Sequence, residues 1–317
     1  MKAIILGVMS ALFFAVTFVL NASMEQAGGH WAWSASLRYF FMVPFLVIIV
    51  AWRQKSAPLR QSMKAHRTKW MLWSTVGFGL FYAPLCFAAM YAPGWLIAGT
   101  WQVTIIAGAL LSPLFFITEN GKKVRGKIPW RMLSLSSIIL CGVALMQLEH
   151  AKNISLSTVL LGVLPIIIAA FMYPLGNRKM MDVTAGKIGV FERLLGMTIA
   201  SMPFWLLLAC YAYIEVGLPS TTQLVQSAVV AISSGIIATA LFFAATDLVK
   251  GDMTKLAGVE ATQSFEVLFA LVGEILFLAI VLPSTLGIAG IVLVMLGMMM
   301  QSMYLMVHAK KGRLSIS

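Results

Sequence analysis

Four polar side chains interrupt a long apolar stretch between residues 256 and 282, namely Glu260, Gln263, Glu266 and Glu274. At 100° per residue on an α-helix, these positions fall within roughly a third of the circumference, and apolar residues cover the rest. Carboxyl groups inside a membrane are costly and usually mark a pathway, a proton relay or a buried ion pair. The pattern therefore predicts a helix whose polar face forms one wall of a transport cavity.

The carboxyl groups of this predicted helix differ in their expected depth in the membrane. With a rise of 1.5 Å per residue from residue 256, Glu266 lies roughly 15 Å deep, close to the middle of the membrane. A carboxyl there changes its protonation as its access to water changes, so Glu266 is the first candidate for proton coupling or cation binding. Glu260, about one turn from the membrane surface, is the second. The alternative for both is a carboxyl hydrogen-bonded to a neighbouring helix.

Aromatic and amide side chains at similar depth are candidates for substrate binding, with plain packing as the alternative. The face of a tryptophan ring can hold an organic cation, and tyrosines give an adaptable polar and aromatic lining. The candidates are Trp101, Gln102, Gln263, Tyr82 and Tyr173.

Two arginines also fall inside apolar runs. Arg38 and Glu274 are both expected in the outer half of the membrane, where they form an ion pair that is either structural or a gate. Arg193, one turn inside its span, either pairs with Glu119 or extends its side chain to the interface. Both arginines can alternatively attract an anionic group of a cargo molecule.

The composition indicates that these residues lie in the membrane-spanning part of a protein. The chain has 317 residues, of which 60% are hydrophobic and only 11% charged, with a mean hydropathy of +0.92. Ordinary soluble domains carry about 25% charged residues. The fold class is therefore an all-α membrane protein with many spans. Its histidines lie outside the spans, its three cysteines form no CxxC pair, and no HExxH, GxSxG or phosphate-loop motif occurs. We expect neither an enzyme nor a metal or cofactor.

About 20 apolar residues cross a bilayer, and this length divides the chain into ten transmembrane helices. The predicted spans are 3–21, 32–52, 70–91, 94–117, 132–148, 157–176, 188–214, 224–249, 256–282 and 287–307. With this division, 20 of the 23 Lys and Arg residues fall on one side of the membrane. The positive-inside rule then places both termini in the cytoplasm. The net charge of +12 is thus a topology signal and an attraction to lipid headgroups, which leaves no nucleic-acid partner.

The sequence also contains a weak internal repeat. Arg38 matches Arg193 at an offset of 155 residues, and Gln102 matches Gln263 at an offset of 161. The repeat divides the chain into two five-helix units, residues 1–150 and 151–317. Because five is an odd number, the two units must be inverted relative to each other, an arrangement typical of alternating-access transporters.

These features resemble the drug/metabolite transporter superfamily, and within it the EamA-like and multidrug resistance efflux branch. The resemblance lies in the ten spans, the Arg early in the second span of each half, and Val272-Gly273-Glu274 before a glycine-rich last span. Two departures stand out. The four-span relatives carry a proton-coupling Glu in their first span, whereas residues 3–21 contain no acid. Pro113 stands where the first half would mirror Glu274.

The leading hypothesis is a secondary exporter of small amphipathic or cationic compounds, driven by proton antiport with alternating access, in the inner (plasma) membrane of a bacterium. Its partners are a small-molecule substrate and the lipid bilayer, and it is a monomer or homodimer. The alternative is a facilitator or exporter of an anionic metabolite such as a carboxylate, amino acid or phosphorylated compound. A polar stripe at mid-membrane depth argues against a membrane scaffold.

Overall fold

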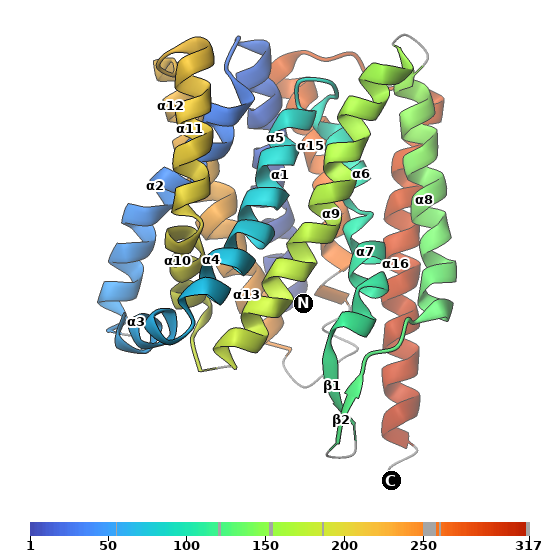
Figure 1. Ribbon diagram of the computed structural model, residues 1–317. Helices are drawn as coiled ribbons and strands as arrows, with labels where there is room; N and C mark the ends of the chain where they lie inside the picture. Colours follow the sequence, from blue (N-terminus) through green and yellow to red (C-terminus); the bar gives the residue numbers. More distant parts are fainter. Residues whose placement is uncertain are drawn as a thin grey trace.

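The protein is an α-helical bundle whose long helices run side by side, and both ends of the chain lie at the same end of the bundle (Figure 1). The computed structural model describes residues 1–54, 56–119, 122–151, 155–185, 187–249, 258–259 and 261–314. A two-stranded antiparallel hairpin, which pairs Phe116 with Arg125 and Glu119 with Lys122, projects from the end that carries the termini.

The first part of the chain contains α1 (Lys2–Gln26), α2 (Trp31–Trp52), α3 (Ser56–Ala65), α4 (Arg67–Ser74), η1 (Thr75–Gly79), α5 (Leu80–Ala88), α6 (Gly94–Trp101), α7 (Thr104–Leu110), η2 (Ser112–Leu114), β1 (Phe116–Glu119), β2 (Lys122–Arg125) and α8 (Trp130–Ala151). The second part contains α9 (Leu156–Thr184), α10 (Val190–Ala200), α11 (Met202–Val216), α12 (Thr221–Val230), η3 (Ala231–Ala238), α13 (Thr239–Asp247), η4 (Thr262–Ser264), α15 (Phe265–Leu278) and α16 (Thr285–Leu314).

The helices confirm a multi-pass membrane protein. Within the described residues, seven helices are long and apolar enough to cross a membrane, and α10 with α11, bent by 48°, makes an eighth if the pair is one span. The two other predicted spans, 94–117 and 256–282, are interrupted. The count of ten spans therefore stays a prediction.

Both interrupted spans depart from the continuous helices expected there. The first ends α6 at Trp101 and resumes at Thr104, and the helical structure stops near Pro113, whose missing N–H cannot continue a helix. In the second, Thr262–Ser264 is a 3₁₀ turn and α15 begins only at Phe265. The continuous helix predicted for 256–282 is therefore wrong, whereas its single polar face stays a prediction because Glu260 lies outside the described residues.

Two other spans contain π-helical segments. The segment η1 joins α4 to α5, and η3 joins α12 to α13. They begin at residues 75 and 231, which are 156 positions apart. Such segments widen a helix locally and are frequent at functional sites.

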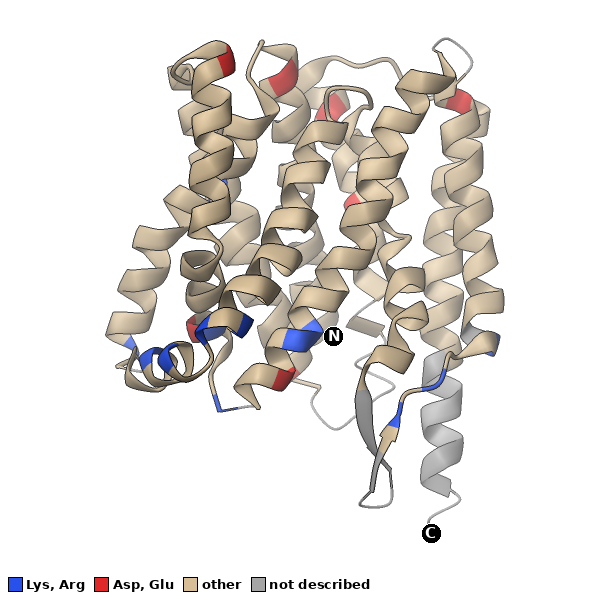
Figure 2. Cartoon of the chain, in the orientation of Figure 1, with Lys and Arg blue, Asp and Glu red and all other residues tan. Residues whose placement is uncertain are grey.

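Charge divides the two ends of the bundle. Lys and Arg residues gather at the end that holds the termini, where acidic residues such as Glu192 also lie, whereas Asp and Glu are found at the opposite end (Figure 2). The short helix α3 belongs to the basic end and buries Leu59 against the bundle. Of the salt bridges among described residues, Arg53 with Glu192 at 3.3 Å ties the segment after α2 to α10 at this end. We call this end the basic end.

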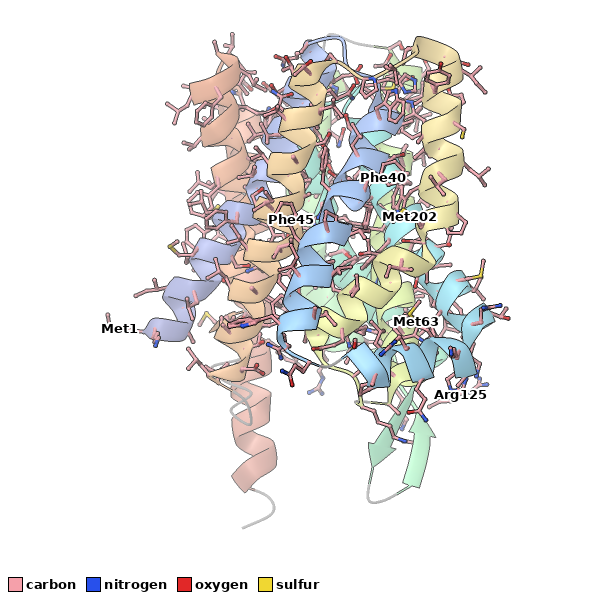
Figure 3. All side chains as sticks on the ribbon, turned by 90° about the vertical axis from the view of Figure 1, so that its left-hand side faces the viewer. Met1, Phe40, Phe45, Met63, Arg125 and Met202 are labelled. Carbon is pink, nitrogen blue, oxygen red and sulfur yellow. The ribbon has the colours of Figure 1, made fainter. Side chains whose placement is uncertain are left out.

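Apolar side chains cover the outer faces of the helices, as a lipid environment requires (Figure 3). Phe45 on α2, for example, keeps 38% of its surface exposed. Inside, small residues allow backbones to approach, as in other membrane helix pairs. A Cβ on Gly290 of α16 would lie only 2.7 Å from the carbonyl oxygen of Gly142 on α8, so these helices pack backbone against backbone.

Candidate transport cavity

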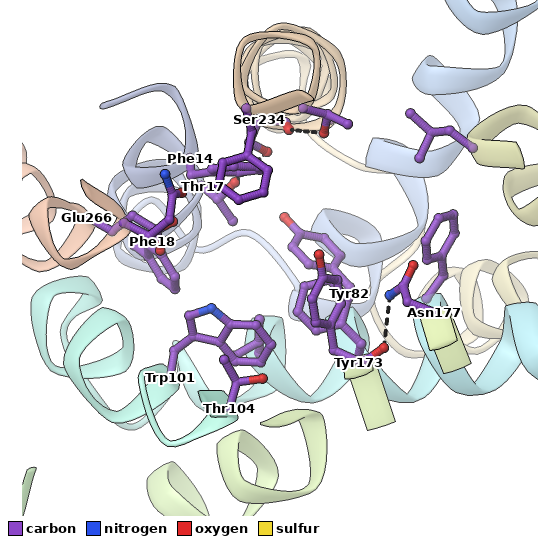
Figure 4. A pocket seen from close by; sticks show the side chains of 18 of the residues that line it. Phe14, Thr17, Phe18, Tyr82, Trp101, Thr104, Tyr173, Asn177, Ser234 and Glu266 are labelled. Atoms are coloured by element: carbon purple, nitrogen blue, oxygen red, sulfur yellow. Dashed lines mark hydrogen bonds between the residues drawn. The ribbon is translucent and has the colours of Figure 1, made fainter. Parts of the chain in front are cut away.

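A cavity of about 450 Å³ lies in the centre of the bundle. Thirteen of the described elements contribute to its wall, from α1 and α2 to α15 and α16. Figure 4 shows Glu266 and Trp101 on one side of the cavity and Tyr82, Tyr173 and Asn177 on the other. A volume of this size is typical of sites for small organic molecules.

Glu266 lies in the first turn of α15 and lines the cavity. Only 6% of its surface is exposed, and its carboxyl contacts the side chain of Gln102. Gln102 follows the last residue of α6 and donates to the carbonyl of Ala98 at 3.1 Å. Gln263, on η4, also lines the cavity and donates to the carbonyl of Gly7. The two breaks in the helices thus place both amides in the wall of the cavity that Glu266 also lines.

The predicted aromatic residues meet in one cluster of the cavity wall. The ring of Phe81 lies 5.1 Å from that of Trp101 and 4.7 Å from that of Tyr173, and Trp101 meets Tyr173 edge-on at 5.6 Å. These residues come from α5, α6 and α9, so the cluster joins both parts of the chain. Its faces offer a flat apolar surface to a bound molecule.

Arg38 also lines the cavity, on the side of Tyr82. Its guanidinium carbon lies 4.1 Å from the centre of the Tyr82 ring, and its enclosed Nε has no hydrogen-bond partner among the described residues. The Tyr82 hydroxyl donates to Asn21 at 3.2 Å, which fixes the ring under the guanidinium. Because Arg38 is only 8% exposed, its positive charge is held in the protein interior next to the cavity.

Glu274 does not pair with Arg38 in this structure, which corrects the expected gate. The carboxylate of Glu274 is fully buried and accepts hydrogen bonds from the backbone N–H groups of Gly94, at 2.7 Å, and Trp95, at 2.8 Å. It therefore caps the N-terminus of α6, where the helix leaves N–H groups without intrahelical partners and favours a negative charge. The sequence search considered charged side chains as partners of Glu274, whereas its partners are the first backbone N–H groups of α6.

The other predicted pair concerns Arg193, which lines the cavity near the basic end. The expected partner is Glu119, whose side chain lies outside the part of the chain that the structure describes, so this pairing stays a prediction. The neighbouring Glu192 turns away and binds Arg53 instead. The second predicted coupling residue, Glu260, also lies outside the described residues.

Several cavity residues were not singled out from the sequence. Gln301 on α16 is only 3% exposed, and both of its amide atoms lack a partner among the described residues. Thr17 on α1 donates to Ser234 on η3 at 2.6 Å, within the cavity wall. The signal that could have found them is a polar residue in the middle of an apolar span.

The end of the cavity away from the termini is closed by hydrogen bonds between distant segments. Gln223 of α12 donates to the carbonyl of His30 and to Ser34, both at 2.9 Å, and Trp33 donates to the carbonyl of Gly217 at 3.0 Å. We call this region, together with the Glu274 cap, the sealed end. In the other direction the wall continues to Val190, the first residue of α10. The cavity thus extends toward the basic end.

An apolar helical bundle that encloses a largely apolar cavity with a few polar and charged side chains is typical of polytopic membrane transporters. The chain belongs to the family described as "EmrE: Putative multidrug resistance efflux transporter", whose profile matches residues 1–307. This membership confirms the resemblance to the drug/metabolite transporter superfamily.

Two relatives match this chain in sequence over most of its length. "Uncharacterized protein YjlA" of Bacillus subtilis (strain 168) is 55% identical, over 95% of this chain and 94% of its own length. "Uncharacterized 42.1 kDa protein in intracellular alkaline protease 3'region" of Shouchella clausii is 51% identical, over 84% of this chain and 70% of its own. A solved structure described as "Crystal structure of protein" has a TM-score of 0.61 at 13% identity, covering 96% of this chain and 97% of that one, a likeness of fold alone.

Proposed function

We propose that the protein is a secondary-active exporter of small organic compounds, which bind in the central cavity and leave in exchange for protons. The observation that carries the proposal is a buried carboxyl, that of Glu266, which among the described residues is the one acidic group in the wall of a cavity of about 450 Å³ inside an apolar bundle. A membrane-embedded carboxyl beside a cavity is the usual device for coupling proton movement to cargo movement. Membership of an efflux family supports the direction of transport.

The proposed topology is ten spans in two inverted five-helix halves, residues 1–150 and 151–317, with both termini in the cytoplasm. Three features support it. Basic residues gather at the end that carries the termini, as the positive-inside rule requires. The π-helical segments begin 156 residues apart, at 75 and 231. The two helix breaks fall at Gln102 and Gln263, the residues matched by the sequence repeat. With this topology the cavity faces the cytoplasm.

In the proposed mechanism the cargo and a proton compete for the carboxylate of Glu266. In the ionised form Glu266 binds a cationic or hydrogen-bond-donating group of the cargo, with Gln102 beside it and Gln263 elsewhere in the same cavity wall. A proton that arrives from outside neutralises the carboxyl and weakens this contact, so the cargo is released. Alternation between the two sides requires the hydrogen bonds of Gln223 and Trp33 at the sealed end to break while the basic end closes.

A second candidate is export or facilitated movement of an anionic metabolite. The specific observation in its favour is that Arg38 and Arg193 both line the cavity, whereas the expected ion pair between Arg38 and Glu274 is absent. Two guanidinium groups provide the fixed positive charge that a carboxylate or phosphate needs.

Reconstitution in liposomes tests the proposal. The vesicles are loaded at low pH, diluted into a buffer of higher pH, and given a permanently charged aromatic quaternary ammonium dye outside. Proton antiport drives dye into the vesicles, and collapse of the gradient with a protonophore stops it. Protein-free vesicles are the control. Flux of an aromatic carboxylate, with no flux of any cation tested, would overturn cation export in favour of the second candidate.

A further inference from the structure

The cavity wall contains a guanidinium group and a carboxyl group that do not form an ion pair with each other. Arg38 and Glu266 both line it, and among the described residues no salt bridge joins them. Arg38 lies over Tyr82, and Figure 4 places Tyr82 on the side of the cavity opposite Glu266. A buried charge without a counter-charge is costly, so a molecule bound in the cavity would stabilise each group by supplying the opposite charge.

The arginine side of the cavity is built for an acceptor. Only 8% of the surface of Arg38 is exposed, and its Nε is enclosed without a hydrogen-bond partner in the described part of the chain. The ring of Tyr82, itself held by Asn21, supports the face of the guanidinium and leaves its edge as the binding surface. A guanidinium edge matches the two oxygens of a carboxylate.

The carboxyl side of the cavity is built for a donor. Glu266 presents an acceptor in the same wall as Gln301, whose amide has no partner among the described residues. Between the two sides lies the aromatic surface of Trp101, Phe81 and Tyr173. A cargo with only a positive charge would face two arginines, and a cargo with only a negative charge would face Glu266.

We propose that the preferred cargo is amphoteric: a carboxylate at one end binds Arg38, a protonated amine at the other binds Glu266, and a flat apolar body lies on the aromatic surface between them. This inference rests on the proposed function, because it assigns the substrate class of the same cavity. It also unites the cationic and anionic candidates, since one molecule supplies both groups.

Three probes that share one ring test the proposal by calorimetric titration of the purified protein in detergent. 4-(Aminomethyl)benzoate carries both charges at opposite ends, benzylamine carries only the amine, and 4-methylbenzoate carries only the carboxylate. A charged hydrogen bond contributes enough for roughly tenfold in affinity, so the amphoteric probe should bind about tenfold more tightly than either of the others. Phenylalanine, whose two charges are adjacent, should bind more weakly than the amphoteric probe.

Variants assign each end of the probe. Arg38→Gln should remove the advantage of the amphoteric probe over benzylamine and keep its advantage over 4-methylbenzoate, and Glu266→Gln should do the reverse. Arg38→Lys keeps a cation and should retain part of the preference, which separates loss of binding from loss of folding. Arg60→Gln, at an exposed position on α3, is the matched control and should change nothing.

The outcomes distinguish this inference from the function on which it rests. Equal affinity for all three probes, or a preference that both variants leave intact, overturns the amphoteric cargo even if the dye is pumped. Tight binding of the amphoteric probe with no proton-driven flux supports the binding assignment and overturns the exchange mechanism. Tighter binding of phenylalanine would overturn the separation of the two charged ends.

Discussion

The helix α15 carries two buried carboxyl groups eight residues apart, Glu266 and Glu274, and their surroundings differ completely. Glu274 has no exposed surface and accepts two backbone hydrogen bonds from α6. Glu266 lines the cavity, with a side-chain amide beside it. The first is therefore part of the scaffold at the sealed end, and the second is a group left available for a cargo or a proton.

The contrast between Glu266 and Glu274 indicates that burial of a carboxyl in a membrane protein is not by itself a sign of a role in transport. What matters is whether the protein supplies the partners. Two backbone N–H groups at a helix N-terminus satisfy Glu274 permanently. The partners of Glu266 leave room for a molecule to bind. The predictions below test this contrast in order of their expected effect on stability.

The largest loss of stability is expected for Glu274→Ala. The substitution leaves the N–H groups of Gly94 and Trp95 buried without an acceptor, at a cost of roughly 3 kcal/mol. Thermal unfolding in detergent, followed by tryptophan fluorescence, measures it. Glu274→Gln keeps one acceptor oxygen and should lose less. An unchanged unfolding temperature for the alanine variant would show that the cap is not structural.

A smaller loss is expected for Gly94→Ala, which tests the fit of α6 at the same place. Its Cβ would lie 2.6 Å from the carbonyl oxygen of Phe18, a backbone atom that cannot turn away. Overpacking of this kind costs about 1–3 kcal/mol. Gly162→Ala is the matched control, because the atoms nearest to its Cβ would be side-chain atoms at 3.5 Å, an ordinary contact distance. Equal unfolding temperatures for the two variants would contradict the close contact.

The sequence predicted the membrane class and the contents of the cavity well, for one physical reason. Polar side chains in apolar spans must face the protein interior, so Trp101, Gln102, Tyr82, Tyr173 and Glu266 were grouped by their type and depth, and all of them line one cavity. The grouping needed no knowledge of helix packing. Their roles in binding stay predictions.

What the sequence did not predict depends on breaks in helices. Apolar composition is the same in a continuous helix, a π-helical segment and a broken span, so the breaks after Trp101 and at Thr262 gave no signal. The partner of Glu274 was missed for a different reason, because the start of α6 at Gly94 agrees with the predicted span. A search for a charged side chain cannot find the backbone N–H groups of Gly94 and Trp95.

The next prediction concerns the hydrogen bonds that close the sealed end. Gln223→Ala removes the donor to the His30 carbonyl and to Ser34, which should cost about 1–2 kcal/mol because the Ser34 acceptor is buried and the His30 carbonyl is partly buried. Thermal unfolding measures the loss, and Thr222→Ala, at an exposed neighbouring position, is the control. A variant as stable as the control would show that these bonds do not hold the two helices together.

The smallest effect on stability, and the largest on transport, is expected for Glu266→Gln. The amide keeps the size of the side chain and removes a charge that has no salt-bridge partner among the described residues, so unfolding should change by less than about 0.5 kcal/mol. Flux in the wild type should rise as the pH on the loading side rises, because protons then compete less with the cargo for the carboxylate.

In the Glu266→Gln variant that dependence on pH should disappear, since the amide does not titrate. Initial rates in liposomes at several pH values measure it. Glu25→Gln, which alters a half-buried carboxyl outside the cavity, should keep the wild-type profile. If Glu266→Gln retained the full pH dependence, proton coupling would have to be carried by a different group. The contrast with Glu274 would then be one of packing alone, because neither carboxyl of α15 would take part in transport.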